Sequence, residues 1–174
     1  MKYLKYFENY ITIGDKEITQ EDLNLILKGY IDCALWTEEE RLKESEKLNI
    51  DFNEDDEDDE LDEIEKIIRM NQAFKSKSIQ IFTKEDIDFN SLIAAYTDIK
   101  KFISEAGSES VDYAIEENGL ERLGHDIWLT RNGHGAGFFD HSYDDDIEKK
   151  LTEAAEKLKE AHLYITDDNK LAFI

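Results

Sequence analysis

The side chains best suited to chemistry gather in one stretch of the sequence, from Gly124 to Asp140. This stretch holds two of the four histidines, one of the two tryptophans and four of the eight glycines of the chain. Imidazole, carboxylate and guanidinium groups are the usual acids, bases and ligands of protein sites. However, the histidine spacing matches no zinc signature, and the chain carries no nucleophile elbow, phosphate-binding loop or dinucleotide fingerprint. The sequence therefore predicts no catalytic residue, metal ligand or cofactor.

A turn signal inside this stretch sets the expected geometry. Asn132-Gly133 between strand-like residues predicts a β-hairpin with a two-residue turn. That turn would place Arg131 opposite His134 at one end of a face, and His125 opposite Asp140 at the other. About 20 Å of strand would separate these two pairs, so they would not meet at one centre. The candidate binding residues of the predicted hairpin are His125, Asp140, Arg131, His134, Trp128, Gly135 and Gly137.

Three interpretations of the predicted hairpin stay open. In the first it is scaffold: Gly137 lies opposite Trp128 and leaves room for the indole, and His125 is a buried histidine paired with Asp140. In the second, the glycine-rich face forms a pocket for a ligand or a partner. In the third, the stretch is an enzymatic site, which needs a nucleophile or a metal, and His125, His134, His141 and Asp140 are the candidate ligands.

The second feature with a chemical consequence is the charge. The 174 residues include 43 acids and 21 bases, a formal net charge of −22. Ten acids and no base lie between Asp51 and Glu63, so this run accounts for almost half of the net charge. Nucleic acids and anionic membranes repel such a protein, and we expect neither as a direct partner. The predicted acidic surface comprises Asp51, Glu54, Asp55, Asp56, Glu57, Asp58, Asp59 and Glu60.

The acidic run has three interpretations of its own. A run of like charges is usually a solvated, flexible loop. Asp51, Asn53 and Asp55 match the first oxygen-ligand positions of a calcium loop, but Asp56 occupies the position that requires glycine. Alternatively, the carboxylates mimic phosphates and occupy a basic groove on another protein, toward which electrostatic complementarity steers them.

Composition indicates an ordinary cytoplasmic protein. Hydrophobic residues make up 40% of the chain, too many for a wholly disordered protein, and the length suits one domain. A single cysteine excludes a disulfide framework. No stretch approaches eighteen apolar residues, and the first eight residues include an acid, so we expect neither a membrane span nor a secretory signal.

The elements that must position these residues are predicted mainly as helices. Thr19 is expected to cap a helix of about four turns, on which Cys33 is a buried, unreactive thiol. Gly107 and Gly119 are expected to end two later helices. Helices are expected over 19–36, 61–74, 90–106, 108–118 and 144–162, a strand over 78–82, and hairpins over 10–18 and 163–174. We expect a single α+β domain over residues 1–174, with amphipathic helices on a small antiparallel sheet built from hairpins, and a flexible acidic segment at about 50–63.

Several segments resemble a widespread group of short proteins carried by bacteriophages and other mobile elements. They are GHDIWLTRNGHGAGFFD, the LTEAA helix and LYITDDNKL tail that follow it, and LKGYIDCALW near the N-terminus. The resemblance covers roughly residues 20–36 and 90–174, and the acidic middle departs from the group. It implies a phage or mobile-element setting, and therefore the cytoplasm of a bacterial host, but supplies no catalytic residues.

Two functions from different classes fit these observations. The first is a non-enzymatic accessory protein that inhibits a basic host protein, such as a nucleic-acid-binding defence factor, by charge mimicry. The second is a small ligand-binding protein or enzyme centred on the predicted hairpin. We favour the first, because of the net charge, the run from Asp51 to Glu63 and the absence of a credible active site in the sequence.

Overall fold

The computed structural model describes residues 11–13, 16–48 and 84–174. Within these ranges the chain is mostly helical with short antiparallel strand pairs, so the predicted α+β class is confirmed. In chain order the elements are β1 (Ile11–Ile13), β2 (Lys16–Ile18), α1 (Gln20–Leu48), η2 (Lys84–Asp86), α3 (Phe89–Ala106), α4 (Ser108–Asn118), α5 (Leu120–Arg131), η3 (Phe138–Asp140), α6 (Asp145–Glu156), β3 (Leu163–Ile165) and β4 (Leu171–Phe173).

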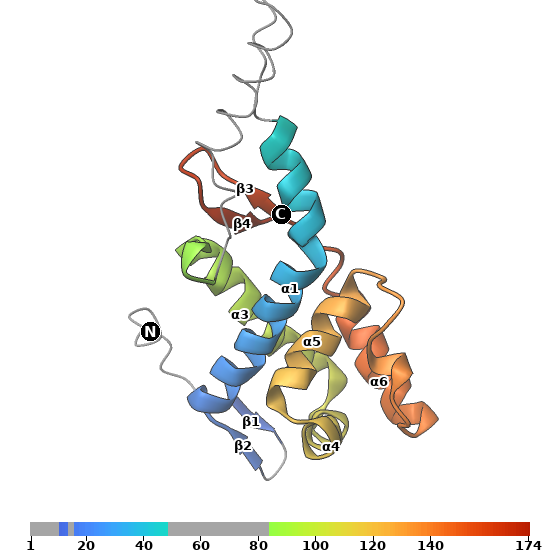
Figure 1. Cartoon of the computed structure of the whole chain (residues 1–174). Helices are drawn as coiled ribbons and strands as arrows, with labels where there is room; N and C mark the ends of the chain where they lie inside the picture. Colours follow the sequence, from blue (N-terminus) through green and yellow to red (C-terminus); the bar gives the residue numbers. More distant parts are fainter. Residues whose placement is uncertain (1–10, 14–15, 49–83) are drawn as a thin grey trace, which may run out of the picture.

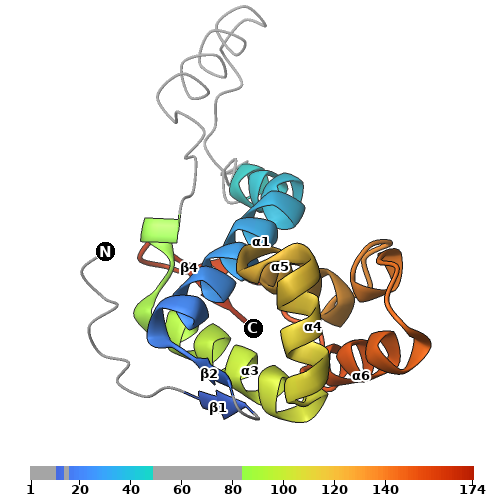
Figure 2. The ribbon, with the colours of Figure 1, turned by 90° about the horizontal axis from the view of Figure 1, so that it is seen from below.

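Helices α1 and α5 pack along each other through the middle of the molecule (Figure 1). Helices α3, α4 and α6 contact one another around them, as the view from below shows (Figure 2). The β3–β4 pair lies against α1. The largest fully buried side chains include Trp128, Tyr30, Phe102 and Phe138, which come from three helices and η3. One hydrophobic core therefore joins the elements on both sides of residues 49–83.

Several helix ends lie where capping residues predict them. The Thr19 hydroxyl accepts a hydrogen bond from the Asp22 N–H at 3.2 Å, and the Asp22 carboxylate accepts one from the Thr19 N–H at 2.9 Å. Gly107 and Gly119 have φ values of +80° and +85°, and their N–H groups donate to carbonyls in the last turns of α3 and α4. The predicted helix ends at these glycines and the predicted cap at Thr19 are confirmed.

Two helices differ in length from the prediction. Helix α1 continues to Leu48, well past Trp36, and Leu42 in this extension is only 4% exposed. Helix α6 ends at Glu156, because the chain turns at Lys159, whose φ is +68°. In α1 the polar residues from Thr37 onward suggest an end that the helix does not have, and Glu38 among them is buried. After α6 the apolar Leu158 and Ala161 continue the helical spacing into the turn.

The strands of both terminal hairpins are confirmed. β1 pairs with β2 with Ile11 opposite Ile18, and β3 pairs with β4 with Leu163 opposite Phe173, both antiparallel. The acidic run, the helix expected within 61–74, the strand expected over 78–82 and the Gly14-Asp15 turn lie outside the described residues.

The prediction of a hairpin around Asn132-Gly133 is wrong, because these two residues end helix α5. Gly133 has a φ of +62° and donates its N–H to the carbonyl of Thr130, and the N–H of His134 donates to the carbonyl of Leu129. These two bonds form the Schellman arrangement at a helix C-terminus. A glycine with positive φ suits this arrangement as well as it suits a hairpin turn, which explains the error.

Candidate functional site

The structure disperses the residues that the predicted hairpin would have paired. His125, Trp128 and Arg131 lie on α5; His134, Gly135 and Gly137 lie in the connection to η3; and Asp140 ends η3. The predicted pairs His125–Asp140 and Arg131–His134 depend on strand alternation, whereas a helix rotates successive side chains around its axis. As a result Arg131 is buried at 6% exposure, while Asp140 is exposed.

Trp128 belongs to the core. It is 0% exposed, and its indole N–H donates to the Thr37 hydroxyl of α1 at 2.8 Å. Its ring meets that of Tyr30 edge to face at a centroid distance of 5.1 Å. Gly137 does allow another group to pack closely against the backbone, but that group is Thr130 and not Trp128 as the hairpin predicted. A Cβ at Gly137 would lie 2.3 Å from the Thr130 hydroxyl oxygen, and its φ is +146°.

Arg131 joins three helices. Its guanidinium donates to the Tyr30 hydroxyl of α1 and to the Asp98 carboxylate of α3, at 2.8 Å for the latter. It also donates to the carbonyls of Leu158 and Lys159, at 3.1 and 2.7 Å, just past the end of α6. A positive charge near a helix C-terminus is stabilising, because it interacts favourably with the negative end of the helix dipole and its donors satisfy free carbonyl groups. These contacts occupy the guanidinium and point to a structural role.

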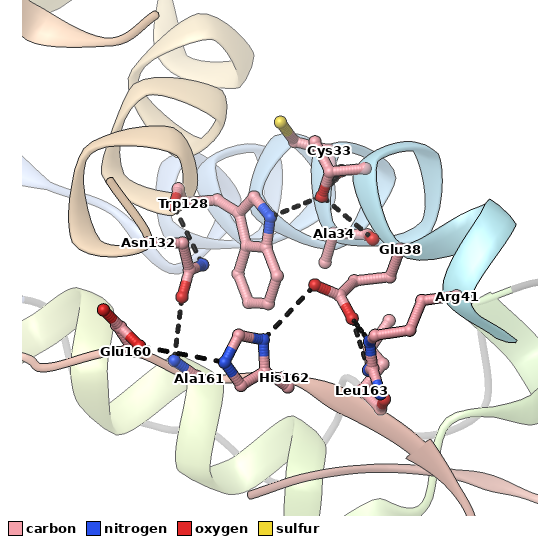
Figure 3. Close-up of polar contacts among 11 residues, drawn as sticks. Cys33, Ala34, Glu38, Arg41, Trp128, Asn132, Glu160, Ala161, His162 and Leu163 are labelled. Carbon is pink, nitrogen blue, oxygen red and sulfur yellow. Dashed lines mark hydrogen bonds and ion pairs between the residues drawn. The ribbon is translucent and has the colours of Figure 1, made fainter. Parts of the chain in front are cut away.

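A second set of polar contacts ties the segment after α6 to α1 and α5 (Figure 3). The Asn132 side chain accepts a hydrogen bond from the Ala161 N–H at 2.8 Å. His162 Nδ1 lies 3.4 Å from the Glu38 carboxylate, which also pairs with Arg41. The Glu38 side chain is only 7% exposed, and His162 and Arg41 both lie within ion-pair distance of its carboxylate.

The third cluster centres on Asp126, which the sequence did not single out. The Asp126 carboxylate is 1% exposed; one oxygen lies 2.7 Å from His141 Nε2 and the other 3.0 Å from Arg122 Nε. Burial raises the pKa of Asp126 above its ordinary value, although Arg122 and His141 act in the opposite direction. The ring of His141 lies beside that of Tyr143, with centroids 5.0 Å apart. Because Asp126 and His141 are fifteen residues apart across the misread turn, no local pattern indicated the pair.

The buried carboxylate of Asp126 predicts an unusual dependence of stability on pH. Its folded-state pKa is raised, so its contribution to stability falls as pH rises from the unfolded pKa through the folded one. Asp126→Asn lacks this loss. The stability difference, variant minus wild type, should therefore increase in urea unfolding experiments as pH rises above about 4, the ordinary pKa of an aspartate.

Asp88 provides the control of opposite sign. Burial alone would raise its pKa, but hydrogen bonds from Ser91 and the Asn90 N–H at the start of α3 lower the pKa of Asp88 overall. For Asp88→Asn the same difference should decrease as pH rises. A slope of the wrong sign for either variant would contradict the pKa shift assigned to that residue.

Cys33 is buried, as the sequence predicted. It is 0% exposed, and burial, together with the negative charge of Asp126, raises the pKa of its thiol to about 12. Such a thiol stays protonated near neutral pH and is a poor nucleophile. Cys33 therefore serves packing in α1.

Three further findings bear on the class of the protein. Among the described residues, no group of three or more His, Cys, Asp or Glu side chains is arranged to hold a metal ion. No helix in the described ranges is long and apolar enough to cross a membrane. No protein-family model, curated protein or solved structure matches the chain.

Proposed function

We propose that the protein is an acidic, non-enzymatic binding module that occupies a basic, nucleic-acid-binding surface of a host protein. The phage or mobile-element setting comes from the resemblance of the segment from Gly124 to Asp140, and of its flanks, to proteins carried by such elements. The mode of action comes from the charge, which would present carboxylates where the partner expects phosphates. The observation that best supports this proposal is the net negative charge of the folded domain itself.

The folded domain is acidic without the run from Asp51 to Glu63. Residues 11–13, 16–48 and 84–174 include thirty acids and fifteen bases, a formal net charge of −15. The greater part of the total of −22 therefore belongs to residues with defined positions. A charge held on a folded surface supports orientation as well as attraction, because complementary potentials fix the register of two rigid surfaces.

Many basic side chains of this domain are already engaged with acids. Among the side chains that the structure describes, ion pairs engage Lys28, Arg41, Arg122, Arg131, Lys149 and Lys157. Two of these pairs involve a carboxylate that is nearly inaccessible to solvent. Exposed acids such as Asp144, Asp145 and Asp146 at the start of α6 therefore dominate the potential of their surface.

The proposal predicts binding that salt weakens. Immobilised protein should retain basic proteins from a bacterial lysate at about 50 mM salt and release most of them at about 500 mM, because the Debye length shortens severalfold. A retained protein should then lose its DNA or RNA when the acidic protein is added. Binding that does not depend on ionic strength would exclude charge mimicry.

Two matched variants separate a local surface from the total charge. Asp144, Asp145 and Asp146 changed together to Asn remove three charges at the start of α6, and Glu153, Glu156 and Glu160 changed together to Gln remove three charges near its end. A specific contact at one end should make one variant bind more weakly than the other. Equal weakening would indicate that total charge alone determines the affinity.

A further inference from the structure

Trp36 on α1 is the most exposed aromatic side chain among the residues that the structure describes. It is 69% exposed, whereas the other tryptophan of the chain, Trp128, is 0% exposed in the core. The buried side of α1 carries Tyr30, Cys33 and Ala34, and Trp36 lies outside it. Within the described part of the chain, the Trp36 indole makes no ring contact and no hydrogen bond. Tryptophan is usually well buried and is enriched in binding hot spots, so this ring indicates an interface.

Carboxylates flank Trp36 on the surface of α1. Asp32 comes four residues before Trp36 and Glu39 three residues after it, and these spacings make side chains neighbours on a helix. The Asp32 side chain is 43% exposed, and Glu39 is exposed as well. Lys28, the base one turn before Asp32, lies 3.1 Å from Asp32 and 3.2 Å from Glu121, so two carboxylates engage it. The exposed indole is therefore surrounded by negative charge.

An aromatic face beside carboxylates suits a cation. The negative face of an indole attracts a positive charge more strongly than the ring of tyrosine or phenylalanine does. A neighbouring carboxylate adds an ion pair to the same cation. A second copy of this chain would bring a net charge of −22 toward the surface, and repulsion opposes that contact. Charge complementarity therefore favours a positively charged partner over self-association.

We propose that Trp36 receives an arginine side chain of the basic partner, with the guanidinium stacked on the indole and paired with Asp32 or Glu39. Arginine fits better than lysine, because a planar guanidinium can stack on a ring and donate to a carboxylate at the same time. This inference rests on the proposed function, and it adds to the acidic surface a specific contact that charge alone does not supply.

Acrylamide quenching of tryptophan fluorescence reports on this contact in the full-length chain. Titration with hexa-arginine at about 50 mM salt should protect Trp36 from the quencher, because the stacked guanidinium covers its ring. Trp128 is already buried, so peptide binding should not change its quenching. Trp36→Leu leaves Trp128 as the sole tryptophan and measures its share of the signal.

Calorimetric titration of variants measures what the ring contributes. Trp36→Leu should weaken hexa-arginine binding about twofold to fivefold, the range of a cation–π contact at an exposed site. Tyr164→Leu is the matched control, because Tyr164 is an aromatic residue exposed to 38% without a flanking acid. Its cross-strand neighbour is Ala172, and strand alternation places His162 and Thr166 beside it on the same face. Its loss should change the affinity less than about 1.5-fold.

The outcomes distinguish this inference from the proposed function. Hexa-arginine that binds but leaves Trp36 open to acrylamide would overturn the contact at Trp36 and leave the charge-driven function intact. Failure of hexa-arginine to bind would also overturn the contact, and both proposals would fall if basic lysate proteins were not retained at low salt either. Protection of Trp36 that grows with protein concentration, without peptide, would show that a second copy covers the ring and would overturn the arginine contact. Equal affinity and protection with hexa-lysine would overturn the preference for arginine.

Discussion

Gly124→Ala should lower the free energy of unfolding by about 3 kcal/mol, the upper part of the range for overpacked sites. A Cβ at Gly124 would lie 2.0 Å from the carbonyl oxygen of Ile26 and 2.6 Å from the backbone nitrogen of Tyr30. The contact is reciprocal, since a Cβ at Gly29 would lie 1.9 Å from the carbonyl oxygen of Glu121. The two glycines therefore let the backbones of α1 and α5 touch.

The cost is large because no side chain can move to relieve it. Backbone atoms on both helices form the contact, so α1 and α5 must separate along the interface that also holds the Trp128–Thr37 hydrogen bond. The higher helix propensity of alanine offsets only about 1 kcal/mol of this loss. Urea unfolding of the variant and the wild type measures the difference.

Gly135→Ala is the matched control. A Cβ at Gly135 would have no atom within 4 Å, and the φ of Gly135 is not in the left-handed region. Its stability should change by less than about 0.5 kcal/mol. If Gly124→Ala unfolds at the same urea concentration as this control, the close contact of α1 with α5 is contradicted.

The glycines also show what the sequence could and could not predict. The sequence predicts Gly107 correctly because it follows a long apolar stripe at helical spacing, and Gly119 because it stops the shorter helix from Ser108 to Asn118. Gly133 was misread, although Leu120, Leu123 and Ile127 before it recur at helical spacing. A β-branched residue, a tryptophan and the Asn-Gly pair outweighed that spacing. The positive φ of Gly133 suits a hairpin turn and a helix end alike, whereas Asn132, with a φ of −98°, lacks the positive φ that a type I′ turn requires.

The polar clusters were beyond local reasoning for a different reason. The partners of Arg131 come from α1, α3 and the end of α6, up to 101 residues away in the sequence. Asp126 and His141 meet only because α5 ends at Gly133 and the chain turns back. The net charge, in contrast, follows from composition alone, and most of it falls within the residues that the structure describes.

Arg131→Met should destabilise the protein by about 4 kcal/mol, the range found when one partner of a buried ion pair is removed. Methionine fills a similar volume but donates no hydrogen bond. The Tyr30 hydroxyl, the Asp98 carboxylate and the two carbonyls after α6 would all lose their donor. Water can replace the donor at Asp98, because the Asp98 side chain is 34% exposed. Arg131→Lys should recover part of the loss, because a single ammonium cannot reach all four acceptors.

Lys149→Met removes a positive charge from an exposed pair and serves as the control. Lys149 is 71% exposed and lies 3.9 Å from Glu153, so its loss should change stability by less than about 0.5 kcal/mol. The comparison also decides between two roles for Arg131. A variant that keeps its unfolding midpoint but loses lysate-protein binding would return Arg131 to the binding surface expected from the sequence. A large loss of stability, with binding per folded molecule unchanged, would establish the guanidinium as the link between α1, α3 and the end of α6.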